Sequence, residues 1–172
     1  MSETYARPDY LIEPDALAAR ISAGDVRVFD GTVFLEPAER GYRARSGLAE
    51  YQQAHIPGSA FVDQLSELSD SSSGLGFTLP AATDLQRALG RIGAVSDVDV
   101  VVYSSGHPMW ATRLWWLLHY AGHDKVAVLN GGFAAWQEAG LPVTDEAETH
   151  AEGSFQGEVR QQRFVDQQTV LA

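Results

Sequence analysis

Apolar and polar positions alternate in blocks along the first 140 residues, and the blocks follow two different periods. Short strands are predicted at 26–30 and 60–62, and apolar runs typical of strands buried on both faces lie at 99–103 and 126–129. Between these runs apolar residues recur at helical spacing, as at Leu85, Leu89 and Ile92. Strands separated by helices predict an α/β fold, in which helices cover both faces of a parallel sheet.

Proline and glycine place the ends of the predicted helices. Pro14 suits the first turn of a helix, where its missing N–H costs nothing, and Gly24 suits the end of that helix. Further helices are expected at 47–54, from Pro80 to Ile92, at 109–121 and from Phe133 to Ala139, before Gly140. With these helices the chain predicts three layers around a sheet of about five strands.

The composition changes after Val143. Acidic residues are frequent and apolar ones scarce at 144–163, which indicates a linker. Apolar residues return at 164–172, with Asp166 placed to cap a new helix. We therefore expect one domain over residues 10–143, an acidic linker over 144–163, and the start of a second domain at 164–172. In that case Phe164, Val165, Val170 and Leu171 have no partners inside the first domain.

Charge and cysteine content exclude several functions. The chain has 12 basic and 23 acidic residues, a formal charge of −11, which disfavours binding to nucleic acids and to anionic membranes. We find no apolar run of about 18 residues and no signal-peptide layout, so a cytoplasmic protein is expected. The chain has no cysteine, which excludes disulfides, thiolate metal sites and cysteine nucleophiles. The five histidines lack metal-ligand spacing, and no metal or cofactor is expected.

The loop that follows the run at 99–103 is the most promising place for chemistry. Ligands of parallel sheets bind where strands end and helices begin, because backbone N–H groups there converge on an anion. The candidate residues for binding an oxyanion are Ser104, Ser105, Gly106, His107 and Met109. An ordinary strand-to-helix connection is the plain alternative. A serine hydrolase would need a base and an orienting group beside Ser104, and no G-x-S-x-G motif supplies them.

Three stretches resemble the rhodanese family: His55-Ile56-Pro57-Gly58-Ser59-Ala60, the strand Val100 to Tyr103, and Leu129-Asn130-Gly131-Gly132-Phe133-Ala134-Ala135-Trp136 continuing to Val143. They come in the family's order and at its spacing, across residues 10–143. The resemblance implies a rhodanese fold and transfer of sulfur from thiosulfate or 3-mercaptopyruvate. The insert between Asp30 and His55, with Arg113-Leu114-Trp115-Trp116, resembles the first domain of tandem rhodaneses.

Ser104 occupies the position of the family's nucleophilic cysteine. A persulfide requires a thiolate, so a serine hydroxyl cannot carry the sulfur. The resemblance implies that first domains of tandem rhodaneses lack this cysteine, which predicts a structural and regulatory domain beside a catalytic second one. An engineered Cys-to-Ser substitution and a free-standing module that binds an oxyanion or a partner are the alternatives.

Contacts with a second domain are expected from residues that packing within the first domain does not require. The predicted helix at 109–121 carries more large apolar residues than one buried stripe hides, so Trp110, Trp115 and Trp116 are candidates. Arg43 belongs to a basic cluster and is a candidate for the interdomain cleft, although a solvated loop would explain it equally. His55 is expected to fix the turn before Pro57 by a hydrogen bond.

Overall fold

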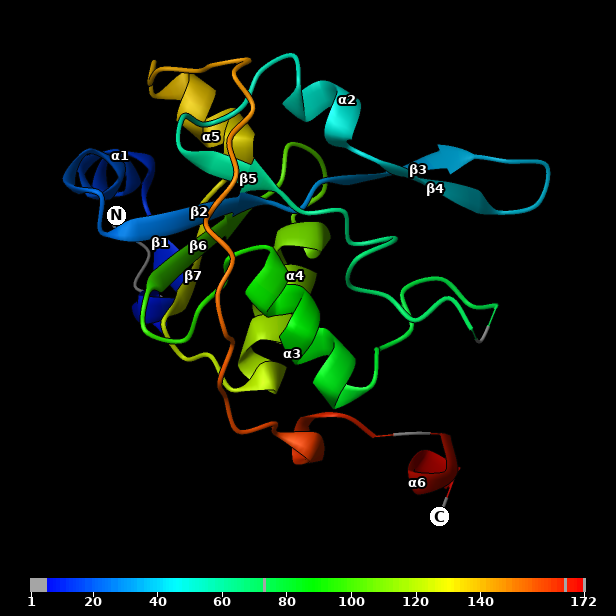
Figure 1. Cartoon of the computed structure of the whole chain (residues 1–172). Helices are drawn as coiled ribbons and strands as arrows, with labels where there is room; N and C mark the ends of the chain where they lie inside the picture. Colours follow the sequence, from blue (N-terminus) through cyan, green and yellow to red (C-terminus); the bar gives the residue numbers. More distant parts are fainter. Residues whose placement is uncertain (1–5, 73, 166, 172) are drawn as a thin grey trace.

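The computed structural model describes residues 6–72, 74–165 and 167–171. Five parallel strands form the central sheet in the order β1-β7-β6-β2-β5 (Figure 1). The strands are β1 (Leu11–Ile12), β2 (Val26–Asp30), β3 (Val33–Pro37), β4 (Tyr42–Ser46), β5 (Ser59–Phe61), β6 (Asp99–Tyr103) and β7 (Val126–Leu129). The helices are α1 (Pro14–Ala23), α2 (Leu48–Tyr51), α3 (Ala82–Arg91), α4 (Met109–Ala121), α5 (Gly132–Glu138) and α6 (Gln167–Leu171), with 3-10 turns η1 (Pro8–Tyr10) and η2 (Gln161–Arg163).

Alternate residues of the central strands enter two separate cores. Val100 and Val102 of β6 face α3 and α4, whereas Val101 and Tyr103 face α1 and α5. Both sets are buried, which explains why β6 is apolar without a break. The predicted three-layer α/β fold with five parallel strands is therefore confirmed (Figure 1).

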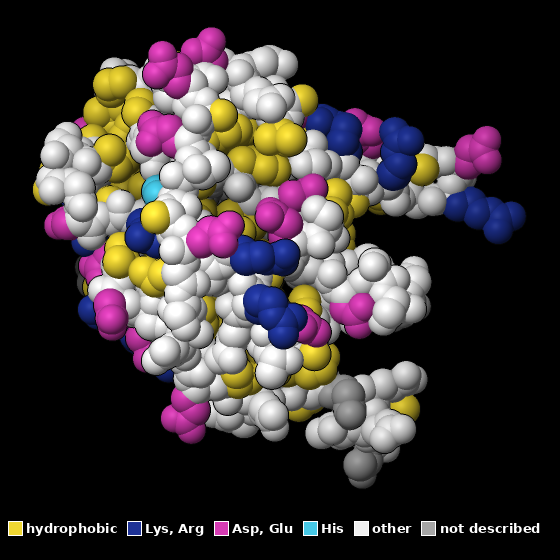
Figure 2. Space-filling model, viewed as in Figure 1, with side chains coloured by type: hydrophobic (Ala, Val, Ile, Leu, Met, Phe, Trp, Pro, Cys, Tyr) yellow, Lys and Arg dark blue, Asp and Glu magenta, His cyan; other side chains and the backbone are white. Residues whose placement is uncertain are grey.

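The segment after β2 holds a hairpin that the hydrophobic pattern did not predict. β3 and β4 pair antiparallel as a separate two-stranded sheet, which projects from the domain (Figure 1). On one face of this hairpin Glu36 binds both Arg43 and Arg45, and the Arg45 guanidinium lies over the Phe34 ring. Figure 2 shows basic side chains gathered on the hairpin. Charged cross-strand pairs stabilise it, so the usual apolar signal of a strand is weak here.

Residues 144–160 are extended, as expected of a linker, but they pack along the domain instead of leaving it. Thr144 exchanges two backbone hydrogen bonds with His55, and the Arg160 N–H donates to the Tyr120 carbonyl at 2.8 Å. Phe155 is only 8% exposed and joins the core under α3 and α4. The first domain therefore continues well beyond Val143, because a single buried phenylalanine anchors an otherwise polar segment.

The packing of this segment also changes the expectation for α4. The helix does carry more large apolar residues than one buried stripe can hide, but the domain covers most of them on further sides. Trp110 and Tyr120 are buried, whereas Trp115 and Trp116 are half-buried. The sheet, α3, Tyr10 and residues 155–160 surround α4, so it is covered on more than one stripe.

The last described residues stand apart from the core. Phe164, Val165, Val170 and Leu171 are between 48% and 76% exposed, as expected. The proposed capping residue Asp166, and Ala172, lie outside the described residues. That this segment opens a second domain stays a prediction. In the described part of the chain, no helix is long and apolar enough to cross a membrane.

Candidate functional site

The loop after β6 lies where three neighbouring strands end. β2, β6 and β7 run parallel, so Ser104 and the residues after it meet the β7–α5 turn at one edge of the sheet. The Phe133 N–H donates to the Ser104 carbonyl at 3.2 Å. Gly132 has a φ of 61°, and a Cβ there would lie 2.6 Å from the Ser104 oxygen. This close approach of two backbones requires glycine.

A depression of about 360 Å³ opens at this edge. The ends of β1 and β7, the loop after β6 and the first turns of α4 and α5 contribute its walls. Its lining residues are small or apolar for the most part: Leu11, Ser104, Gly106, Pro108, Ala111, Thr112, Val128, Leu129, Asn130, Gly131 and Gly132. No lysine or arginine is among them, so a bound anion would rely on backbone N–H groups.

Ser104 is turned toward the backbone of its own loop. Its side chain is buried, and its hydroxyl donates to the His107 carbonyl at 3.1 Å. The His107 ring instead accepts a hydrogen bond at Nδ1 from the Met109 N–H at 3.2 Å. The imidazole therefore does not serve as a base for Ser104, and the geometry does not support a serine hydrolase.

The amides of the loop are only partly free. The Ser105 N–H donates to Thr32 Oγ1 at 2.8 Å, and the Met109 N–H is used by His107. Pro108 has no N–H. Among the residues that the structure describes, the amides of Gly106 and His107 have no acceptor. The loop brings the predicted anion-binding residues together, and Gly106 and His107 offer backbone donors for a ligand.

Comparison with known proteins identifies the family and the fold. The family model described as "Rhodanese-like domain" matches residues 13–139, which is most of the chain. The chain belongs to the rhodanese family. This match spans the stretches on which the resemblance rested, apart from residues 140–143.

Curated relatives are similar across most of this rhodanese chain. The thiosulfate sulfurtransferase of Gallus gallus is 38% identical over 83% of the chain and 47% of its own length. A probable 3-mercaptopyruvate sulfurtransferase of Pseudomonas aeruginosa is 37% identical over 94% of the chain and 56% of its length. The 3-mercaptopyruvate sulfurtransferase of Escherichia coli is 33% identical over 85% of the chain and 50% of its length. The chain spans about half the length of these relatives.

Solved structures agree with the fold. The crystal structure of SseA from Escherichia coli, described with the catalytic mechanism of 3-mercaptopyruvate sulfotransferases, superposes with a TM-score of 0.73 and 31% identity. The similarity covers 88% of this chain and 57% of that one. Tum1 from Saccharomyces cerevisiae, with a TM-score of 0.72 and 23% identity, shows the fold alone.

Sequence reasoning missed a buried carboxylate behind the loop. Asp30 is fully buried at the end of β2, where its Oδ1 accepts hydrogen bonds from the N–H of Thr32 at 2.8 Å and from the Thr32 hydroxyl. Its Oδ2 has no partner among the described residues. Burial raises the pKa of Asp30 to about 6, against the two hydrogen bonds from Thr32 and smaller opposing contributions from Tyr103 and His55. An aspartate at the end of an apolar strand was the only signal in the sequence.

His55 has the structural role that the sequence predicted. Its Nδ1 lies 2.6 Å from the Tyr51 carbonyl, its Nε2 lies 3.1 Å from the Glu146 carbonyl, and its ring stacks on Tyr51. Both nitrogens are therefore engaged by the backbone. Within the described residues, no group of three His, Asp or Glu side chains is placed to hold a metal.

The interdomain candidates differ in their accessibility. Trp110 is buried beneath Phe77, at 4.7 Å between ring centroids, so this chain already covers it and the expectation for Trp110 is corrected. Trp115 donates from Nε1 to the Val126 carbonyl, and Trp116 stacks on Tyr120; each keeps part of its surface free. The Arg43 side chain on the hairpin is 76% exposed and binds Glu36.

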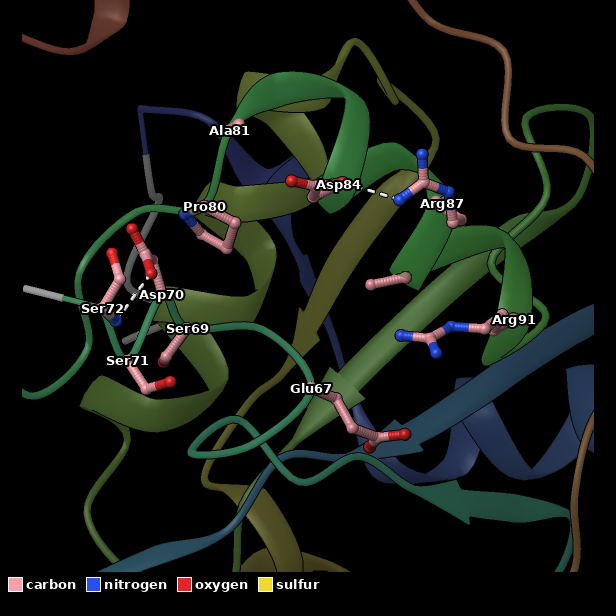
Figure 3. A pocket seen from close by; sticks show the side chains of 11 residues that line it. Glu67, Ser69, Asp70, Ser71, Ser72, Pro80, Ala81, Asp84, Arg87 and Arg91 are labelled. Atoms are coloured by element: carbon pink, nitrogen blue, oxygen red, sulfur yellow. Dashed lines mark hydrogen bonds and ion pairs between the residues drawn. The ribbon is translucent and has the colours of Figure 1, made fainter.

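A larger depression, of about 550 Å³, lies beside α3 (Figure 3). Four of its charged side chains, Glu67, Asp84, Arg87 and Arg91, are exposed, and Asp84 and Arg87 pair with each other at 2.6 Å. The fifth, Asp70, is half-buried and accepts a hydrogen bond from the Ser72 N–H at 2.8 Å. It is built from one helix and the loop around Ser69 to Ser72, away from the strand ends. Solvated and self-paired charges give it weak binding potential, so the loop after β6 remains the candidate site.

Proposed function

We propose that this chain is a non-catalytic rhodanese domain that works beside a catalytic rhodanese domain in a thiosulfate or 3-mercaptopyruvate sulfurtransferase. The single observation that carries the proposal is that the chain has no cysteine and Ser104 follows β6, at the family's nucleophile position. The relatives named as sulfurtransferases support the reaction class. They are about twice as long as this chain, which leaves room for a second domain.

The chemistry of sulfur transfer explains why a serine makes the domain inactive. In the first step a thiolate attacks the outer sulfur of thiosulfate, or the thiol sulfur of 3-mercaptopyruvate. An S–S bond forms on the enzyme while the S–S or C–S bond of the donor breaks, and sulfite or pyruvate leaves. In the second step a thiophilic acceptor takes this sulfur and regenerates the thiolate. An oxygen at position 104 cannot form the S–S bond. Ser104 instead stabilises its own loop by donating to the His107 carbonyl.

A catalytic partner would also account for apolar surface on this chain. Phe164 is 48% exposed and Leu171 is 76% exposed. Exposed apolar groups of this size on a small domain favour contact with another protein surface. We place the second rhodanese domain against this segment, with Trp115, Trp116 and Arg43 as further candidate contacts.

Sulfurtransferase assays on the purified chain test the proposal. We expect no thiocyanate from thiosulfate and cyanide above the uncatalysed rate, and none from 3-mercaptopyruvate. The same assay on a full-length sulfurtransferase from Escherichia coli is the positive control for the reagents. Turnover by the chain that survives repurification would show that it transfers sulfur by itself and would overturn the proposal.

A second candidate is a module that binds a small oxyanion without chemistry. The unpaired amides of Gly106 and His107 favour it. The buried carboxylate of Asp30 and the absence of a basic side chain in the lining count against tight binding. Thermal shift titrations with thiosulfate and sulfate separate the candidates, because a binding module is stabilised in proportion to the logarithm of ligand concentration.

A further inference from the structure

A continuous path of hydrogen bonds connects a buried carboxylate to the candidate loop. Asp30 Oδ1 accepts from the Thr32 hydroxyl, and Thr32 Oγ1 in turn accepts from the Ser105 N–H at 2.8 Å. Asp30 and Thr32 are both buried, at 0% and 1% exposure. Asp30 and Thr32 are therefore shielded from water, whereas Ser105, at the other end of the path, is only half-buried.

The fold fixes both ends of this path. Asp30 ends β2 opposite Tyr103, which ends β6, so the residues after each strand leave the sheet side by side. The Gly31 N–H donates to the Tyr103 carbonyl at 3.0 Å. A Cβ at Gly47 would lie 2.6 Å from the Thr32 side chain, which shows how tightly Thr32 is held. The Thr32 hydroxyl consequently has one orientation, between the carboxylate and the loop.

Thr32 gives the charge of Asp30 its main support, with smaller contributions from the Tyr103 hydroxyl and the His55 ring. Two tyrosines, one histidine and one serine face the site: Tyr51, Tyr103, His55 and Ser59. The Tyr103 hydroxyl is engaged by Ser59 Oγ and the Ile56 N–H. Each ring nitrogen of His55 lies near a backbone carbonyl, at 2.6 Å and 3.1 Å. No arginine or lysine pairs with the carboxylate in the described structure, and Oδ2 is unpaired.

We propose that Asp30 is a proton-sensitive positioning residue, which acts through Thr32 to hold or release the Ser105 amide of the loop after β6. The inference rests on the proposed function only in taking this loop as the functional site. When Asp30 is ionised, the Thr32 hydroxyl donates to a carboxylate, and the polarised oxygen binds the Ser105 N–H more strongly. A proton on Oδ2 removes this polarisation and loosens the loop.

The loop would then respond to pH near neutrality. Burial raises the pKa of Asp30 to about 6, so the carboxylate changes its protonation between about pH 7 and 5. At the upper end of this range the Ser105 amide is sequestered by Thr32. At the lower end it becomes available, beside the amides of Gly106 and His107, to a negatively charged ligand or to the loop of a partner domain.

NMR of the ¹⁵N-labelled chain tests the inference. We expect the Ser105 amide resonance to titrate with a midpoint near pH 6 and to exchange with solvent about tenfold faster, after correction for intrinsic pH dependence, once Asp30 is protonated. The Asp30 side-chain carbon, followed in a ¹³C-labelled sample, should titrate at the same midpoint. A flat Ser105 resonance beside a titrating Asp30 would overturn the inference.

Variants separate positioning from a general change of fold. Thr32→Val removes the relay and should abolish the Ser105 response, whereas Thr32→Ser keeps the hydroxyl and should retain it. Asp30→Asn should also flatten the Ser105 titration. His107→Gln controls for the imidazole of the same loop and should leave the titration in place. A Ser105 response that survives in Thr32→Val, or that disappears in His107→Gln, contradicts the inference. Sulfurtransferase activity plays no part in these readouts, so they can fail independently of the proposed function.

Discussion

Phe155 offers the sharpest test of where the domain ends. It lies in the acidic segment that the sequence assigns to a linker, yet it is only 8% exposed and packs with Leu85 and Leu89 of α3 and with α4 in one core cluster. Replacing a buried phenylalanine by alanine costs about 3 to 5 kcal/mol of unfolding free energy. We expect about 3 kcal/mol for Phe155→Ala, because the extended segment can shift to fill part of the space.

Phe164 provides the matched control, nine residues further along the same chain. It is 48% exposed and belongs to neither core cluster, so Phe164→Ala should change the unfolding free energy by less than about 0.5 kcal/mol. Urea titrations followed by the fluorescence of the four tryptophans give both values. A loss below about 1 kcal/mol for Phe155→Ala, or equal losses for both variants, would show that residues 144–160 are not part of the folded domain.

Three other predictions concern pH, backbone geometry and the nucleophile position. Burial lowers the pKa of three histidines in the folded chain, so the unfolded chain binds more protons as the pH falls. The unfolding free energy should therefore fall by about 1 to 2 kcal/mol from about pH 7.5 to about pH 6. A urea midpoint that stays flat or rises over this range contradicts the prediction. These histidines are His119, His123 and His150. Gly132→Ala places a Cβ against the Ser104 carbonyl. It should lower the unfolding free energy by about 2 kcal/mol more than Gly140→Ala, where φ is also positive but the space is open. Equal melting temperatures of the two variants would refute the close approach. Ser104→Cys should form thiocyanate at least about a hundredfold more slowly than a full-length sulfurtransferase, because the Ser105 amide is committed to Thr32 and Pro108 has no N–H; efficient turnover would show an intact anion cradle.

The sheet and its helices were predictable because their signals are local. Each central strand is a short apolar run, and Gly24 and Gly122 end α1 and α4 in the left-handed conformation, as helix-ending glycines do. The hairpin was not predictable in this way. Its strands are held by ion pairs from Glu36 to Arg43 and Arg45 across the ladder, and such pairs leave no period in hydrophobicity.

The packed segment after Val143 shows a second limit of predicting structure from the hydrophobic pattern. Gly153 donates its N–H to the Gly90 carbonyl, and a Cβ at Gly157 would clash with the Ala121 carbonyl. Glycines at such approaches are indistinguishable in sequence from glycines in a flexible linker. One buried phenylalanine among acidic residues was too weak a signal to predict that the segment belongs to the core.

The sequence predicted where the candidate site lies, but it did not predict the hydrogen bonds within the site. The end of an apolar strand followed by Ser104 and a glycine located the loop, and the family resemblance identified its position. The direction of the Ser104 hydroxyl, and the bond from Ser105 to Thr32, join residues up to 73 positions apart in the chain. Only the register between β2 and β6 brings those residues together.

Mass spectrometry of the intact chain after incubation with thiosulfate or 3-mercaptopyruvate tests the central claim most directly. The claim is that this rhodanese domain cannot carry the transferred sulfur, because an oxygen stands at position 104 and the chain has no cysteine. We predict an unchanged mass under conditions in which a full-length sulfurtransferase gains one sulfur atom. A gain of one sulfur atom on this chain, removable by dithiothreitol, would contradict the claim.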